Sequence, residues 1–313
     1  MSALPQTPDA VLRKLEWTVI RRLDGLVHGA YRTLFRGAGL DLADLREYQP
    51  HDDVRHIDWN VTARLQEPYV RQYTEDREVV TWFLLDLSPS IDFGTGDSKR
   101  DLLIHFVTVL ARVLTRHGNP VGAMFYRDGV EGFVLPGAGR RHVLHMLDRL
   151  LKYPALPESR ATDLGALLRH AIGIVKRRSL VFVVSDFIST PGWAKPLAEL
   201  ARRHETVAIR ISDPGETELP NIGIAVMQDT ETGERLFVDT HDAAFRRRFA
   251  AVAERREAEV MDALGNAGVD ALELATGDDL MDSLLRFAAL RKRRGRSVAT
   301  LPRQAERHLG HAP

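Results

Sequence analysis

Two short runs of consecutive apolar residues, each ending on an aspartate, dominate the hydrophobic pattern of the chain. The first run is VVTWFLLD at residues 79–86, and the second is SLVFVVSD at residues 179–186. Runs of this length without polar alternation are typical of strands that are covered on both faces of a parallel sheet. We therefore expect both segments to be inner strands and to lie side by side.

Further strand-like segments and segments with helical spacing alternate along the chain. The pattern predicts strands at residues 79–86, 120–126, 129–135, 179–186, 206–211 and 270–275, and a strand pair within 222–238. It predicts helices at residues 98–118, 140–153, 162–178, 191–203, 241–265 and 279–291. Thr162 is placed to cap the third of these helices. The alternation indicates an α/β fold, with a mainly parallel sheet and helices on both faces.

The N-terminal quarter has a different character. Residues 8–27 have the spacing of an amphipathic helix, whereas the glycines, prolines and paired aspartates of residues 28–78 favour short elements and turns. We expect residues 1–78 to pack as a separate segment on a main domain formed by residues 79–290. The basic segment 291–313 is expected to be a disordered tail.

Composition narrows the classes of function. The 313 residues include 43 lysines and arginines and 43 aspartates and glutamates, so no global charge favours nucleic acid as a partner. The absence of cysteine excludes disulfides, thiolate zinc sites and a cysteine nucleophile. No apolar signal segment begins the chain, and its apolar runs are far shorter than the roughly 20 residues of a membrane helix. We expect a soluble, cytoplasmic protein.

Serines stand two and four positions after the first aspartate, which gives the pattern Asp86-x-Ser88-x-Ser90. Two familiar sites do not fit it. The segment GTGDSKR lacks the glycine that a phosphate-binding loop places before its lysine, and neither serine lies in the G-x-S-x-G turn of serine hydrolases. A carboxylate with hydroxyls offers hard oxygen ligands that suit Mg²⁺ or Mn²⁺. The alternative interpretation is a set of turns and helix caps.

Two more oxygen donors are expected at the same edge of the sheet. Thr162 precedes a predicted helix, and Asp186 ends the second apolar strand. In a parallel sheet, ligands bind beyond the carboxyl ends of the strands. The predicted metal site therefore consists of five residues, namely Asp86, Ser88, Ser90, Thr162 and Asp186.

This order of pieces resembles the metal-ion-dependent adhesion site (MIDAS) of von Willebrand factor A domains. The segment LREYQPHDDVRHIDWNVTAR, followed by YVRQYTEDRE and the strand ending in Asp86, is similar to the family catalogued as domain of unknown function 58. The similarity covers about residues 27–290. Members of that family are von Willebrand A-like proteins usually found with MoxR-type AAA+ ATPases.

The resemblance implies a Rossmann-like sheet of the von Willebrand A type and a function as a non-enzymatic, metal-dependent protein-interaction adaptor. It implies a MoxR-type ATPase as co-worker in assembly, maturation or chaperone-like activity. It also implies that a partner protein donates an acidic side chain to the ion.

Other interpretations of the same residues remain. A metal-dependent hydrolase could use Asp86 and Asp186, but we identify no base or nucleophile for it. The tail could bind nucleic acid or anionic lipid, although a solvated end is the favoured interpretation. A second metal site could be formed by five residues near the N-terminus, for which paired polar contacts are favoured: His51, Asp52, Asp53, His56 and Asp58.

Overall fold

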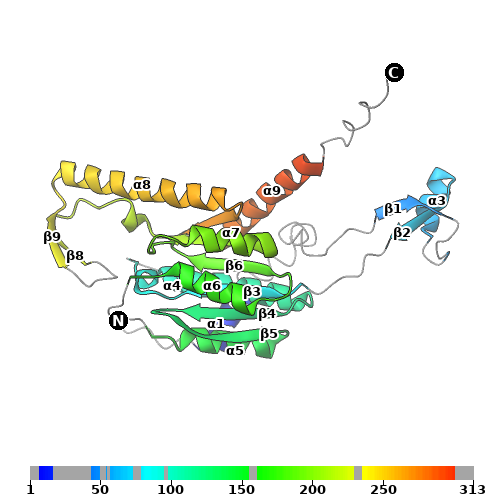
Figure 1. Cartoon of the computed structure of the whole chain (residues 1–313), viewed down its shortest axis with the longest axis horizontal. Coiled ribbons are helices and arrows are strands. Elements are labelled where there is room, and N and C mark those ends of the chain that lie inside the picture. Colours follow the sequence, from blue (N-terminus) through cyan, green and yellow to red (C-terminus); the bar gives the residue numbers. More distant parts are fainter. Residues whose placement is uncertain are drawn as a thin grey trace, which may run out of the picture.

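The structure is a computed structural model that describes residues 7–16, 44–49, 54, 57–72, 79–94, 98–154, 161–228 and 235–299. The helices are α1 (Pro8–Leu15), α3 (Trp59–Leu65), α4 (Lys99–Arg116), α5 (Arg140–Leu151), α6 (Leu164–Ile174), α7 (Ala194–Arg203), α8 (Ala243–Asn266) and α9 (Leu280–Ala299), with short 3-10 turns η3 (Pro89–Asp92) and η4 (Pro214–Glu216). The strands are β1 (Asp44–Glu47), β2 (Tyr69–Gln72), β3 (Thr81–Asp86), β4 (Val121–Tyr126), β5 (Val130–Gly137), β6 (Leu180–Ser185), β7 (Glu205–Ser212), β8 (Ile224–Gln228), β9 (Arg235–Asp239) and β10 (Asp270–Ala275). Figure 1 shows their arrangement.

Among the described residues, six strands form the central sheet in the order β10-β7-β6-β3-β4-β5. All neighbours run parallel except β4 and β5, which are antiparallel. Read from β5 toward β10, and numbered by their order in the chain, these strands are third, second, first, fourth, fifth and sixth, which is the doubly wound order of Rossmann-like folds. The expected mainly parallel, Rossmann-like sheet is confirmed, and β3 and β6 are adjacent inner strands as predicted.

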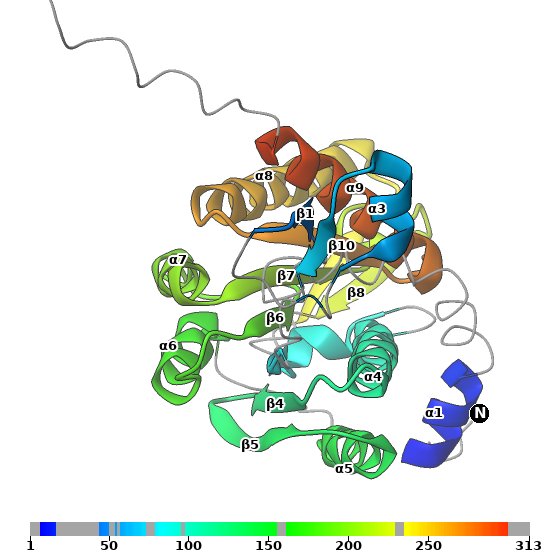
Figure 2. The ribbon, with the colours of Figure 1, turned by 90° about the vertical axis from the view of Figure 1, so that its right-hand side faces the viewer.

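Burial on both faces explains why β3 and β6 lack polar alternation. On one face Phe83 and Leu85 join a core that includes α4, α5 and α9. On the other face Trp82 and Leu84 join a core that includes α6, α7 and α8. Figure 2 shows these helices on opposite sides of the sheet. Strand side chains alternate between faces, so each strand contributes to both cores.

Two local expectations need correction. The residue that caps α6 is Asp163, whose side chain accepts a hydrogen bond from the Ala166 N–H; Thr162 lies one residue earlier. Helix α9 continues to Ala299, past the expected boundary at residue 290, so the helix includes the start of the segment expected to be a disordered tail. Its Arg291 pairs with Glu205 at 2.6 Å, and this contact ties the helix to the sheet.

The N-terminal elements make two kinds of contact. Helix α1 packs on α4 and α5, and Asp9 of α1 pairs with Arg140 at 2.8 Å. Strands β1 and β2 pair with each other, and β2 also forms a single bridge from Val70 to Ile57. Together with α3 they stand apart from the main sheet in Figure 1. For residues 44–72, packing on the main domain therefore stays a prediction. Within the described ranges, no helix is both long enough and apolar enough to cross a membrane.

The inner position of β3 predicts a large stability cost for shortening its side chains. Phe83 is fully buried and stacks on Phe182 with ring centroids 5.4 Å apart. We expect Phe83→Ala to lower the free energy of unfolding by about 3–5 kcal/mol, because it removes apolar contacts and leaves a cavity. Phe133→Ala, on the exposed side of β5, is the matched control and should cost much less. Urea denaturation followed by circular dichroism measures both, and equal losses would contradict the assignment of this core.

Candidate functional site

The predicted site residues lie at the point of the sheet where strand order reverses. Asp86 is the last residue of β3, and Asp186 directly follows its parallel neighbour β6. Open α/β sheets bind ligands at such a switch point, beyond the carboxyl ends of the strands. The two aspartates are close enough for the charge of Asp186 to raise the pKa of Asp86.

Asp86 is a fully buried carboxylate with neutral hydrogen-bond partners. Its Oδ1 accepts a hydrogen bond from the Ser88 N–H at 3.0 Å, and its Oδ2 accepts one from the Ser185 hydroxyl at 2.6 Å. Burial, followed by the charge of Asp186, raises the pKa of Asp86 to about 6, although these hydrogen bonds lower it in part. Both effects disfavour the negative charge unless a cation accompanies it.

The two aspartates start turns of the same kind. Asp86 accepts the N–H two residues ahead, and Asp186 Oδ1 likewise accepts the Ile188 N–H at 2.9 Å. In the second turn, Phe187 lies between Asp186 and Ile188 and has a φ of 60°, in the left-handed region that non-glycine residues rarely adopt. Phe187 is buried and packs on Trp193 with ring centroids 5.2 Å apart. This packing holds the loop in a conformation that aims the Asp186 carboxylate at the sheet edge.

The hydroxyl residues of the prediction lie at the same edge and are buried. Ser88 and Ser90 place their hydroxyl oxygens 3.2 Å apart. Thr162 lies in the loop before α6, where its carbonyl accepts a hydrogen bond from the Thr190 N–H at 2.8 Å. Tyr126 is the register partner of Asp86 in β4. Its hydroxyl accepts a hydrogen bond from the N–H of Asp163, the residue after Thr162. The structure thus brings the loop of Thr162 beside β3 and β4, and its role as a ligand stays a prediction.

Sequence reasoning missed a lysine at the centre of this site. Lys99 is fully buried at the start of α4, and its Nζ lies 2.7 Å from Asp186 Oδ2 and 2.5 Å from Glu216 Oε1. Burial lowers the pKa of Lys99, but the two carboxylates outweigh this effect and raise it, so the side chain is an ammonium ion. Ser185, which binds Asp86, was also missed. A serine directly before Asp186 inside an apolar run was the available signal.

Charge balance tests whether a divalent cation fits these residues. The Lys99 ammonium contacts the carboxylates of Asp186 and Glu216, and the carboxylate of Asp86 lies close to that of Asp186. Two negative charges therefore remain, and Asp86 has no cationic partner among the described residues. A buried carboxylate of this kind requires a proton or a cation. Oxygen donors and a net charge of this sign fit Mg²⁺ or Mn²⁺.

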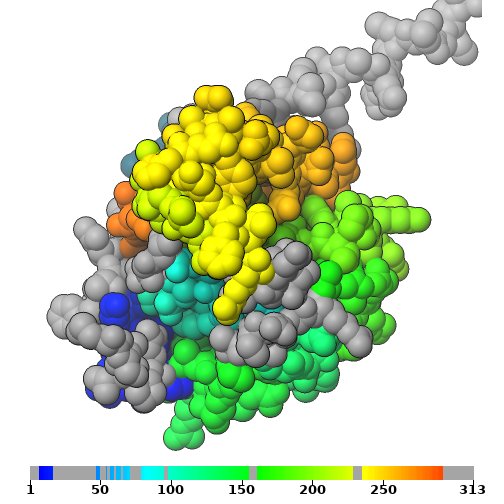
Figure 3. Space-filling view, turned by 90° about the vertical axis from the view of Figure 1, so that its left-hand side faces the viewer, coloured from blue at the N-terminus to red at the C-terminus, as the bar shows by residue number. Residues whose placement is uncertain are grey.

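A cavity of about 150 Å³ opens beside the ion cluster. Asp186 and Glu216 line one side of it, and Phe249 and Val252 of α8 line another. Figure 3 shows the β8–β9 pair and the start of α8 projecting on this side of the molecule, next to the atoms of η3 and α4. Asp186 and Glu216 of the ion cluster therefore border a cavity that α8 also lines.

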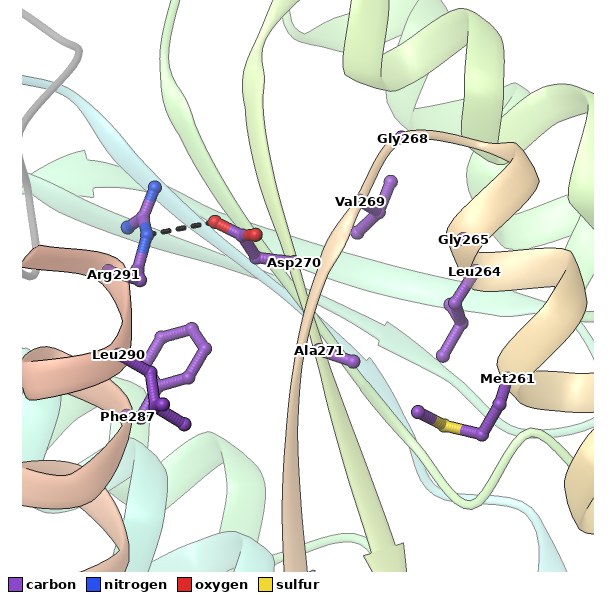
Figure 4. A pocket seen from close by; sticks show the side chains of 10 residues that line it. All are labelled: Met261, Leu264, Gly265, Gly268, Val269, Asp270, Ala271, Phe287, Leu290 and Arg291. Carbon is purple, nitrogen blue, oxygen red and sulfur yellow. Dashed lines mark ion pairs between the residues drawn. The ribbon is translucent and has the colours of Figure 1, made fainter. Parts of the chain in front are cut away.

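A second cavity, of about 540 Å³, lies near the opposite end of the sheet. Figure 4 shows it between α8 and α9, with the edge strand β10 as its floor. Met261, Leu264 and Phe287 make most of its lining apolar, and its charged groups, Asp270 and Arg291, form an ion pair at 2.9 Å. It offers no set of reactive or ligating groups.

The described residues contain no group of three or more histidine, cysteine, aspartate or glutamate side chains arranged to hold a metal. The switch-point site differs from such groups because hydroxyls would supply much of its ligand set. Four residues of the alternative N-terminal site lie outside the described residues: His51, Asp52, Asp53 and His56. Asp58 is buried and accepts a hydrogen bond from the Val61 N–H.

The buried position of Lys99 predicts a strong dependence of stability on its charge. We expect Lys99→Met to lower the free energy of unfolding by ~3–5 kcal/mol, since the substitution leaves two carboxylates without their partner. Lys152→Met is the control, because Lys152 pairs with Asp148 on the surface and should contribute at most about 1 kcal/mol. Urea denaturation in the presence of EDTA provides the comparison. A similar small loss for both variants would show that the Lys99 ion pairs contribute little.

Comparisons with known proteins agree with the expected family. The model of the family described as "Protein of unknown function DUF58" matches residues 44–259. The uncharacterized protein Rv1480 of Mycobacterium tuberculosis and the uncharacterized protein Mb1516 of Mycobacterium bovis are each 38% identical over 286 residues, which cover 91% of this chain and 90% of the relative.

Similar solved structures include an aerotolerance-related membrane protein from Bacteroides fragilis, with 11% identity and a TM-score of 0.44 over 69% of this chain and 99% of that chain. The conserved hypothetical protein BatB from Bacteroides thetaiotaomicron has 12% identity and a TM-score of 0.40 over the same shares. The fold assignment rests on the strand order of the sheet. Because the family model spans most of the chain, and the mycobacterial relatives match nearly all of it, the chain belongs to the DUF58 family of proteins of unknown function.

Proposed function

We propose that the chain is a non-enzymatic protein-interaction adaptor whose contact with its partner depends on a divalent cation, Mg²⁺ or Mn²⁺. The residues that would hold the ion, in part through water, are Asp86, Ser88, Ser90, Thr162 and Asp186. When bound, the ion supplies an open coordination position for an acidic side chain of the partner.

The observation that carries the proposal is the uncompensated charge of Asp86. This carboxylate is fully buried, receives two hydrogen bonds from neutral donors and keeps a raised pKa of about 6. Ser88 and Ser90 are buried beside it and offer neutral oxygens. A cation held mainly by neutral oxygens retains much of its positive charge, which favours capture of an anionic group from another molecule.

An exposed apolar surface close to the site supports protein as the class of partner. In the β8–β9 pair, Ile224, Val226 and Phe237 share one face and are 80%, 54% and 75% exposed. Val226 and Phe237 are direct register partners. The hairpin follows η4, whose Glu216 is part of the ion cluster. Contiguous exposed apolar groups of this kind mark sites of protein association.

The chemistry of Lys99 favours binding over catalysis. Its raised pKa keeps it protonated, so it does not serve as a general base or a nucleophile. The resemblance to MoxR-associated proteins makes a MoxR-type AAA+ ATPase the proposed co-worker, in assembly, maturation or chaperone-like activity. The expectation of a cytoplasmic location is part of this proposal.

Removing the charge of Asp86 should abolish the cation site without unfolding the protein. We expect Asp86→Asn to weaken binding of Mg²⁺ and Mn²⁺ by more than roughly tenfold, because it removes a charge in direct reach of the ion. Asp148→Asn, on the surface of α5, is the control and should leave binding unchanged. Isothermal titration calorimetry measures the dissociation constants. Equal constants in the wild type and Asp86→Asn would contradict the assignment of this site.

The partner contact should need both the ion and the apolar hairpin. We expect immobilised protein to retain a purified MoxR-type ATPase from the same genome in Mg²⁺, to lose it in EDTA, and to regain it when Mg²⁺ returns. Phe237→Asp should weaken retention without changing Mg²⁺ affinity, since Phe237 lies outside the ion cluster. Retention that persists in EDTA would rule out a metal-dependent contact, and no retention in either buffer would rule out this partner.

A further inference from the structure

Lys99 is a cation placed where two electrostatic effects oppose it. It is the first residue of α4, and the free N–H groups of a helix N-terminus carry partial positive charge that disfavours a cation. Its side chain is also fully buried, which disfavours the charge further. A solvent-facing lysine would avoid the second cost. The inward position is explained by the carboxylates of Asp186 and Glu216, which both contact its ammonium.

We propose that Lys99 sets the affinity and the charge selectivity of the switch-point site for cations. This inference rests on the proposed function, because it concerns the same cation site. The ammonium contacts Oδ2 of Asp186, and the Ile188 N–H donates to Oδ1. Both oxygens of Asp186 therefore have protein partners already, whereas the partners of Asp86 are neutral. Asp86 is the carboxylate left to balance an external cation.

The net charge of the cluster predicts how the cation affinity should differ between the wild type and variants of Lys99 and Glu216. In the wild type, two negative charges remain among these four side chains after Lys99 is counted, and they attract a cation. Lys99→Met leaves three negative charges and Glu216→Gln leaves one. The double variant leaves two, as in the wild type. Attraction to an ion scales with the product of the charges, so a trivalent ion should gain more than a divalent ion from loss of the ammonium.

Glu216→Gln is the variant least expected to disturb the fold. The Glu216 side chain is 22% exposed, and its other contact is the cap at the Asp213 N–H, which a glutamine oxygen can also accept. Lys99→Met removes the partner of two carboxylates and is expected to be less stable without metal. The double variant Lys99→Met/Glu216→Gln removes one of those carboxylates and serves as its charge-matched control.

The test is titration of the four proteins with Mn²⁺ and with Tb³⁺ by calorimetry at pH 7.5. We expect Lys99→Met to bind Mn²⁺ on the order of tenfold tighter than the wild type, and Glu216→Gln to bind it on the order of tenfold weaker. The double variant should return close to the wild-type value. The preference for Tb³⁺ over Mn²⁺ should be largest in Lys99→Met. A lysine with only a structural role would change the thermal stability and not this order.

The outcomes separate the two proposals. If the wild type binds Mn²⁺ through Asp86 but Lys99→Met binds no tighter, or Glu216→Gln binds no weaker, the role of Lys99 is wrong and the metal site stands. If Lys99→Met binds Mn²⁺ and the wild type does not, Lys99 controls cation affinity and the proposed metal-dependent function of the native chain is wrong. If none of the four proteins binds either ion, both proposals are wrong.

Discussion

Parallel pairing of β3 and β6 forces two carboxylates together at a buried edge of the sheet. Asp86 ends one strand and Asp186 follows the other, so their separation is set by the spacing of neighbouring strands. Two negative charges at such a distance are unfavourable without compensation. Neighbouring elements supply partners for both carboxylates. Lys99 of α4 donates from its ammonium to Asp186, and Ser185 of β6 donates from its hydroxyl to Asp86.

The negative charges of the two aspartates are compensated unequally, and the proposed function depends on this difference. Asp186 has a cationic partner, whereas Asp86 has hydrogen bonds only from neutral donors. The ammonium also contacts Glu216, which lies in the segment leading to β8, β9 and α8. The cluster is therefore continuous in structure with the projecting hairpin, whose apolar face is exposed. The proposed cation site and the exposed apolar hairpin lie on one side of the molecule, which is the arrangement that the proposed adaptor function needs.

Much of the fold could be predicted because the inner strands are apolar on both faces. The apolar runs that end at Asp86 and at Asp186 bury all their side chains only as inner strands that are covered on both faces of the sheet. Helix ends were less predictable. Thr162 and Asp163 are both good capping residues, and the choice depends on the Tyr126 hydroxyl, which accepts the Asp163 N–H from another strand. Helix α9 likewise extends past the predicted boundary, where Arg291 pairs with the distant Glu205.

The sequence alone predicted a mainly parallel sheet, its two adjacent inner strands, and the strand ends at which Asp86, Ser88, Ser90 and Asp186 lie, because hydrophobic periodicity marks each strand and its end. The full order of the six strands came from the structure. It did not reveal the ion partners of Asp186. Lys99 and Glu216 are 117 positions apart, and neither stands in a recognisable motif with Asp186. Only the tertiary structure decided that an ammonium from the start of α4 would share this site. Packing of α4 against the sheet brings these distant residues together, and burial then makes their pairing obligatory.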